Sequence, residues 1–163
     1  MLKEKTNISD TMKMSGESRK NEGLHVCGKV RLIGSNYNKN GVLEQVFDRE
    51  YNNLITYAGF DLAMDCLGLN SQPSDITHMA IGSGAVKDID GTTLTSEDQR
   101  ETAAYAHTPG AMTCTFTGVF TTVVAATEYG LFNDGSAGSM LNTAGFDSVT
   151  IDSLTIVTTL TLS

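Results

Sequence analysis

Apolar and polar residues alternate along residues 112–162 almost without interruption. At the start of this stretch one parity is mostly apolar and the other carries threonines: Met112, Cys114, Phe116, Phe120 and Val124 against Thr113, Thr115, Thr117 and Thr121. A period of two is typical of β-strands with one buried and one exposed face, and β-branched threonine suits the exposed positions. The pattern predicts antiparallel strands over 112–125, 128–132, 140–146 and 149–162. We expect one core to contain Phe116, Phe120, Leu131, Ile156 and Leu160.

The same alternation occurs earlier in the chain, over residues 26–32 and, less regularly, over 42–51. Between these segments lies turn material, residues 35–41, ending in Asn40-Gly41, a pair that readily supplies positive φ angles. The pattern predicts a β-hairpin. A further short strand is expected over 77–81, where Gly82 ends it.

A change of period marks a single helix. Ile55, Ala58, Leu62 and Cys66 are spaced by three and four residues, which is typical of an amphipathic helix. We expect this helix near residues 54–67, with Asn52-Asn53 before it as a cap. Residues 85–108 show no clear period, so they are expected to form a long loop that Leu94 anchors. The fold class is therefore mainly all-β: an antiparallel β-sandwich, jelly-roll-like, with one short packed helix.

The first 23 residues differ from the rest of the chain. They are polar, rich in Lys, Met and Ser, and without hydrophobic period. Such a segment buries too little apolar surface to order by itself, so we expect an extended, flexible N-terminal arm over residues 1–23. The remaining residues, 24–163, are expected to form a single β-sandwich domain.

Composition and charge disfavour some classes of binding partner. The chain has 163 residues, a formal net charge of −8 and a pI near 4.7, which disfavours nucleic acids and anionic membranes because binding phosphates depends on Lys and Arg. It contains no apolar run long enough to span a membrane and no signal-peptide core, so folding in a cytoplasm is expected. The three cysteines, Cys27, Cys66 and Cys114, are widely spaced and are expected to be reduced and buried.

Candidate chemistry is sparse. The histidines His25, His78 and His107 lie apart in the sequence and are expected to be structural. Gly82-Ser83-Gly84 ends a strand without opening a helix, so it predicts a tight turn rather than a nucleophile elbow or a phosphate loop. Asp88-Ile89-Asp90-Gly91 matches the start of a calcium loop, but Gln99 stands where the twelfth-position Glu is needed. We therefore predict no catalytic, cofactor-binding or metal-binding residues, and no enzymatic activity.

Four motifs, taken in order, resemble small structural proteins of tailed-bacteriophage virions. They are Asn52-Asn53-Leu54-Ile55-Thr56-Tyr57-Ala58-Gly59, Met79-Ala80-Ile81-Gly82-Ser83-Gly84, Thr93-Leu94-Thr95-Ser96-Glu97-Asp98-Gln99-Arg100 and Glu128-Tyr129-Gly130-Leu131-Phe132-Asn133. The resemblance covers roughly residues 24–163. It is to β-sandwich modules used as capsid decoration (cement) proteins, collar and neck components, and bases of tail-collar fibres. It implies homo-oligomers, commonly trimers, and no catalytic residues.

Within these motifs, several residues have physical roles of their own. Glu97 and Arg100 are expected to pair with each other or with a neighbouring subunit. Tyr129 and Leu131 are expected in the core, and Gly130 is expected to let a backbone or an aromatic ring approach closely.

Three functions follow as hypotheses. The first is a non-enzymatic structural protein of a phage particle, folded in the host cytoplasm and bound to the capsid, neck or tail proteins as a homo-oligomeric decoration or accessory subunit. The second is a tail-fibre or baseplate adaptor that takes part in host attachment, for example by binding host carbohydrate. The third is a small jelly-roll enzyme, which the scarcity of histidine and the lack of a ligand cluster disfavour.

Overall fold

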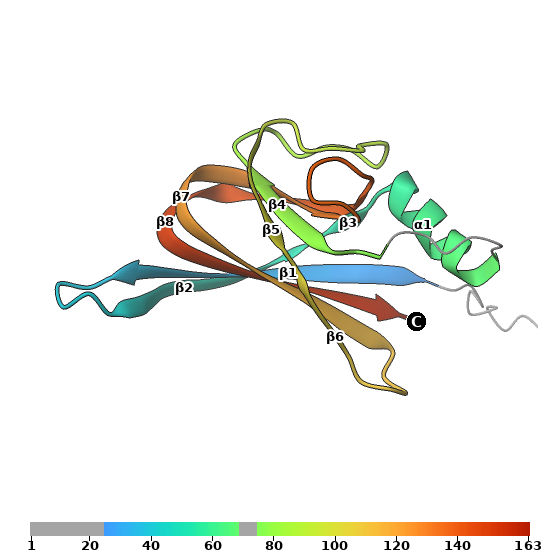
Figure 1. Ribbon diagram of the computed structural model, residues 1–163, viewed down its shortest axis with the longest axis horizontal. Helices are drawn as coiled ribbons and strands as arrows, with labels where there is room; N and C mark the ends of the chain where they lie inside the picture. The colour runs from blue at the N-terminus through green and yellow to red at the C-terminus, as the bar shows by residue number, and fades with distance from the viewer. Residues whose placement is uncertain (1–24, 69–74) are drawn as a thin grey trace, which may run out of the picture.

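Strands make up most of the part of the protein that the structure describes. The computed structural model describes residues 25–68 and 75–163, and the arm predicted over residues 1–23 lies outside them. Within this part of the chain there is one helix, α1 (Tyr57–Gly68) (Figure 1). The strands are β1 (Val26–Tyr37), β2 (Leu43–Asn52), β3 (Leu54–Ile55), β4 (His78–Gly82), β5 (Glu97–Thr102), β6 (Ala104–His107), β7 (Thr113–Phe132) and β8 (Met140–Leu162). The predicted mainly-β class with a single helix is confirmed.

All eight strands belong to one antiparallel sheet, ordered β2-β1-β8-β7-β4-β5, with β3 added to β8 and β6 to β7. β7 and β8 pair with each other along most of their length, but their two halves have different outer neighbours. The last ten residues of β8 pair with β1 and the first part of β7 with β6, whereas the other halves pair with β3 and β4. The long strands curve where these halves meet (Figure 1). One sheet thus folds over itself into a sandwich-like fold.

The core lies between the two halves of this folded sheet. Its buried side chains come from both: Phe116, Phe120 and Ile156 from one half, Met79 and Leu131 from the other. The buried Tyr129 hydroxyl is hydrogen-bonded to Thr158 on the opposite half, and burial raises the pKa of this phenol.

Of the five residues predicted for the core, four are buried: Phe116, Phe120, Leu131 and Ile156. Leu160 is only half-buried and packs against the edge of the core, because it lies near the end of β8.

β7 contains a backbone irregularity that the sequence pattern did not predict. Thr122 and Ala125 have φ angles of 53° and 51°, and the pairing with β8 shifts register between Val123 and Ala126. The buried positions change parity at these residues, from Phe120 to Val123, so Val123 is buried while Val124 is 64% exposed. The expectation that Val124 shares the buried face is therefore wrong. So is the expectation of separate strands over 112–125 and 128–132, since the strand bends at the bulge and continues.

Replacing Thr122 by glycine is expected to raise the free energy of unfolding by up to about 1 kcal/mol, because a β-branched residue is strained at positive φ. The matched control is Thr121→Gly, at the neighbouring exposed position that keeps regular pairing with Ser153. Thr121→Gly should lower the free energy of unfolding, because glycine weakens the interior of a strand. Urea unfolding of both variants measures the contrast, and equal losses in the two would contradict the assignment of strain to Thr122.

The segment over 85–108 is more ordered than predicted. It contains β5 and β6, which sequence alternation missed because both are edge strands whose side chains are largely exposed on either face. A strand with two exposed faces carries no period-two hydrophobic signal. His107, expected in a loop, is accordingly the last residue of β6. The predicted anchor, Leu94, is buried with Ala80, Phe132 and Met140.

The helix begins later than expected because Leu54 and Ile55 pair with Thr143 and Asn142 of β8. Thr56 then caps it, its hydroxyl accepting a hydrogen bond from the Gly59 amide at 3.0 Å. The cap predicted at Asn52-Asn53 is therefore wrong. No helix in the described segments has the length and apolar character needed to cross a membrane.

Candidate functional site

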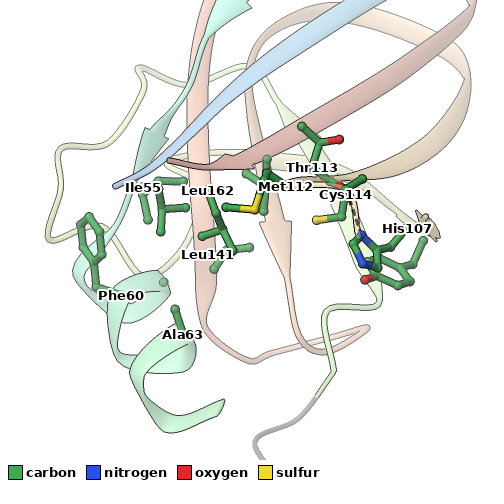
Figure 2. Close-up of a pocket in the computed structure, with 14 residues that line it drawn as sticks. Ile55, Phe60, Ala63, His107, Met112, Thr113, Cys114, Leu141 and Leu162 are labelled. Carbon is green, nitrogen blue, oxygen red and sulfur yellow. Dashed lines mark hydrogen bonds between the residues drawn. The ribbon is translucent and has the colours of Figure 1, made fainter. Parts of the chain in front are cut away.

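An apolar cavity of about 270 Å³ opens at the end of the sandwich where β1 begins and β8 ends. We call it the end pocket. Figure 2 shows Phe60 and Ala63 of α1 on one side of it, and Met112, Cys114 and His107 on the other. The remaining lining residues are Val26, Ile55, Gly59, Tyr105, Ala111, Thr113, Leu141, Leu160 and Leu162. Segments from the whole length of the domain therefore build this pocket.

The helix lies close to the sheet at the end pocket because its inner face carries small residues. A Cβ atom at Gly59 would stand 2.1 Å from the Leu141 carbonyl oxygen, so only glycine allows this approach. Ala63, one turn later, is half-buried and leaves space beside Leu141. Small residues on the helix thus create both the close packing and the cavity next to it.

Few polar groups reach the end pocket. The His107 ring nitrogen Nδ1 lies 3.0 Å from the Thr113 carbonyl oxygen, an interaction drawn in Figure 2. Burial raises the pKa of the half-buried Cys114 thiol, so the thiol is protonated at neutral pH. A cavity lined in this way can hold apolar side chains or an apolar ligand by burial, with little polar selectivity.

A second feature is a fully buried carboxylate, Glu128 on β7. Its oxygens accept hydrogen bonds from three backbone amides of the 83–96 loop: Ser96 at 2.7 Å, Thr95 at 3.0 Å and Gly84 at 3.1 Å. The neighbouring Thr127 hydroxyl donates to the Gly84 carbonyl. Charge-assisted hydrogen bonds of this kind can compensate the burial of a carboxylate without a neighbouring cation. Glu128 therefore fastens the long loop to the sheet.

Sequence reasoning missed Glu128, although a signal was present. It is the only charged residue in the twenty residues of β7. A lone charge in an otherwise uncharged strand indicates a buried group with dedicated partners.

The predicted pairing of Glu97 with Arg100 is confirmed. The two side chains form a salt bridge at 2.6 Å in which Arg100 is largely buried. Arg100 also donates to the carbonyls of Asp134 and Ala137 and stacks over the Phe132 ring, 3.8 Å from its centroid. Arg100 thus holds the turn that joins β7 to β8.

The Asp134 carboxylate caps this turn. It accepts hydrogen bonds from the amides of Ser136 and Ala137, which lower its pKa.

The glycines of the motifs lie at close approaches. A Cβ at Gly82 would be 2.1 Å from the Ser96 carbonyl, so the chain after β4 passes tightly against the loop. A Cβ at Gly130 would meet the rings and side chains of Phe132, Met140 and Leu94, as expected from its place in the strand. Asp88 and Gly91 are joined by an ordinary turn hydrogen bond of 2.9 Å.

The histidines and cysteines are spread over the structure. His25 precedes β1 and pairs through its backbone with Ser163, His78 begins β4 beside the Thr77 hydroxyl, and His107 ends β6. Cys27 is exposed, so its expected burial is wrong, because it lies on the outer parity of β1; Cys114 is half-buried. The side chain of Cys66 lies outside the described residues. Across residues 25–68 and 75–163, no three His, Cys, Asp or Glu side chains gather as a metal site.

Comparison with known proteins gave no match: no protein-family model, curated protein or solved structure is similar to this chain.

Proposed function

We propose that this chain is a non-enzymatic structural protein of a tailed-phage particle, bound to the capsid or neck as a homo-oligomeric accessory subunit. The motif resemblance suggests this role. The observation that carries it is the edge that β2 forms in the sheet of the described residues, which offers a surface for assembly.

β2 forms the outer strand of a long hairpin that projects from the sandwich (Figure 1). Among the described strands it pairs with β1 alone, and most of its ten residues are exposed. Leu43 and Val46 are 45% and 54% exposed, and Val42 before them is 57% exposed. An edge strand presents unpaired amides and carbonyls that can pair with another chain, and exposed apolar groups add buried area on association. These properties suit a subunit that functions in an assembly.

Deleting residues 1–23 tests the proposed place of the arm. We expect the isolated subunit to keep its melting temperature, because the described residues already supply a core between the two halves of the sheet. Occupancy on particles should fall. Ordering the arm costs about 1–2 kcal/mol of backbone entropy per residue, and contacts with neighbouring subunits that repeat over a shell or ring would offset this cost.

The measurement pairs thermal melts of the free subunit with mass spectrometry and electron microscopy of purified tailed-phage particles that carry this chain. Full occupancy by the truncated chain would contradict a role of the arm in assembly. Absence of the intact chain from such particles would contradict the proposed function itself.

A groove beside the hairpin favours a second candidate, an adaptor that binds host carbohydrate. A cavity of about 410 Å³ is lined by Asn36, Tyr37, Thr122, Thr150 and Asp152, among others. Hydroxyl, amide and carboxylate groups beside an exposed tyrosine ring suit a sugar. Microscopy separates the candidates, because an adaptor would be found on the tail fibre or baseplate and a decoration subunit on the head or neck.

A further inference from the structure

The end pocket lies where the described chain begins. Val26, the first residue of β1, lines the pocket, and 24 residues precede His25. The end of β8 lines it as well, through Leu160 and Leu162. The root of the N-terminal segment and the mouth of the pocket therefore share one end of the molecule.

The N-terminal segment has two parts of different chemistry. Residues 15–23 contain no apolar side chain, whereas residues 1–14 contain Met1, Leu2, Ile8, Met12 and Met14. Methionine is unbranched and polarisable, and it fills irregular apolar gaps well. The end pocket is such a gap, built from a helix face and the ends of several strands. Its apolar lining matches the side chains of Ile8, Met12 and Met14.

Charge does not add to this fit. Lys13 stands between Met12 and Met14, and the whole segment up to residue 24 carries five basic and four acidic residues. Helix α1, which forms one wall of the pocket, carries Asp61 and Asp65 and no Lys or Arg. Both aspartates are exposed. The helix residues that line the pocket are Gly59, Phe60 and Ala63, so both aspartates lie on the opposite face of α1, and the fit of the segment rests on its apolar side chains.

We propose that the end pocket of each copy binds the segment around Ile8, Met12 and Met14 of a second copy of this chain. The inference rests on the proposed function in that it names the contact that joins neighbouring subunits. Residues 15–23 can span about 30 Å when extended, at roughly 3.3–3.6 Å per residue. Copies that meet at this end can therefore exchange segments, and each exchange buries apolar side chains that would otherwise face water.

The pocket already contains a thiol that can report the contact. Met12→Cys in the full-length chain, oxidised with copper phenanthroline over a range of protein concentrations, should form a disulfide with Cys114 of another copy. We expect covalent dimers on non-reducing gels, with the 12–114 linkage identified by mass spectrometry. Met12→Cys combined with Cys114→Ser should lose this linkage. Ser18→Cys, in the polar part of the segment, should link to Cys114 at least about fivefold less, because no apolar burial holds it there.

A second pair of variants tests the pocket wall. Ala63→Glu, in the Met12→Cys background, should lower the 12–114 linkage by about tenfold or more, since the carboxylate would have to be buried by the incoming segment. Met64→Glu is the matched control, because Met64 is 65% exposed on the same helix and does not line the pocket. Should Ala63→Glu melt below Met64→Glu, Ala63→Phe, which fills the cavity with an apolar ring, serves in its place.

The proposal is overturned if the 12–114 linkage is absent, if it is no more frequent than from Ser18→Cys, or if it forms only within monomers. This last result would assign the pocket to the copy's own segment. Because the assay uses the purified chain, its outcome is independent of whether the chain is found on phage particles. Linkage without particle occupancy would contradict only the proposed function, and occupancy without linkage only the present inference.

Discussion

Replacing Glu128 by leucine is expected to lower the free energy of unfolding by about 3–5 kcal/mol, the loss typical of removing one partner from a buried charged network. The carboxylate accepts hydrogen bonds from the amides of Gly84, Thr95 and Ser96. Leucine would leave these donors without an acceptor at a fully buried position. Glutamine should cost less, about 1–3 kcal/mol, because it retains one acceptor oxygen but brings an amide group into a site made only of donors.

Urea unfolding measures these losses, and amide hydrogen exchange at Thr95 and Ser96 reports directly on the loop. Faster exchange at both amides in Glu128→Leu is expected even under conditions in which the sheet stays folded. Glu101→Gln, at an exposed position of β5, is the control and should leave the unfolding midpoint nearly unchanged. A midpoint for Glu128→Leu equal to that of this control would show that the 83–96 loop does not depend on the carboxylate.

Phe116→Ala is expected to cost about 3–5 kcal/mol, the usual loss for truncating a buried phenylalanine. Phe116 is 5% exposed and belongs to the main core. Its ring also packs against Tyr105 of β6, with centroids 5.2 Å apart, so the truncation should loosen β6 too.

Val119→Ala supplies the comparison, since Val119 lies on the opposite face of the same strand and is 51% exposed. Val119→Ala should lower the free energy of unfolding by less than about 1 kcal/mol, which is the range that strand propensities span. Denaturant melts of the two variants test the assignment of faces along the first half of β7. A loss below about 1 kcal/mol for Phe116→Ala would contradict it.

The local pattern of apolar and polar residues was sufficient to predict those strands that have one buried and one exposed face. Phe116, Phe120, Leu131 and Ile156 were found from period alone, and the hairpin turn from Asn40-Gly41, whose glycine has a φ of 74°. The single helix was found from the change of period. These features depend on neighbours along the chain, so the sequence alone carries their signal.

The same reasoning failed where the pattern depends on pairing partners. Thr122 takes a left-handed conformation although its residue type disfavours it, and the side-chain amide of Gln99 on β5 lies 3.2 Å from the Thr121 carbonyl beside it. β5 and β6 are strands because β4 and β7 pair with them, not because their residues alternate. The pairing of long-range backbone groups decides such elements, and no local sequence signal records it.

The sequence by itself determined the all-β class, the single helix, the acidic charge and the motifs on which the proposed phage role rests. Only the tertiary structure decided that two long strands fold one sheet over itself, that Glu128 binds loop amides 32 to 44 residues away in sequence, and that the end pocket exists. The pocket joins Val26, Ala63, Cys114 and Leu160, which share no spacing along the chain. A cavity is a property of surfaces brought together by folding, so its residues could not be recognised before the fold placed them side by side.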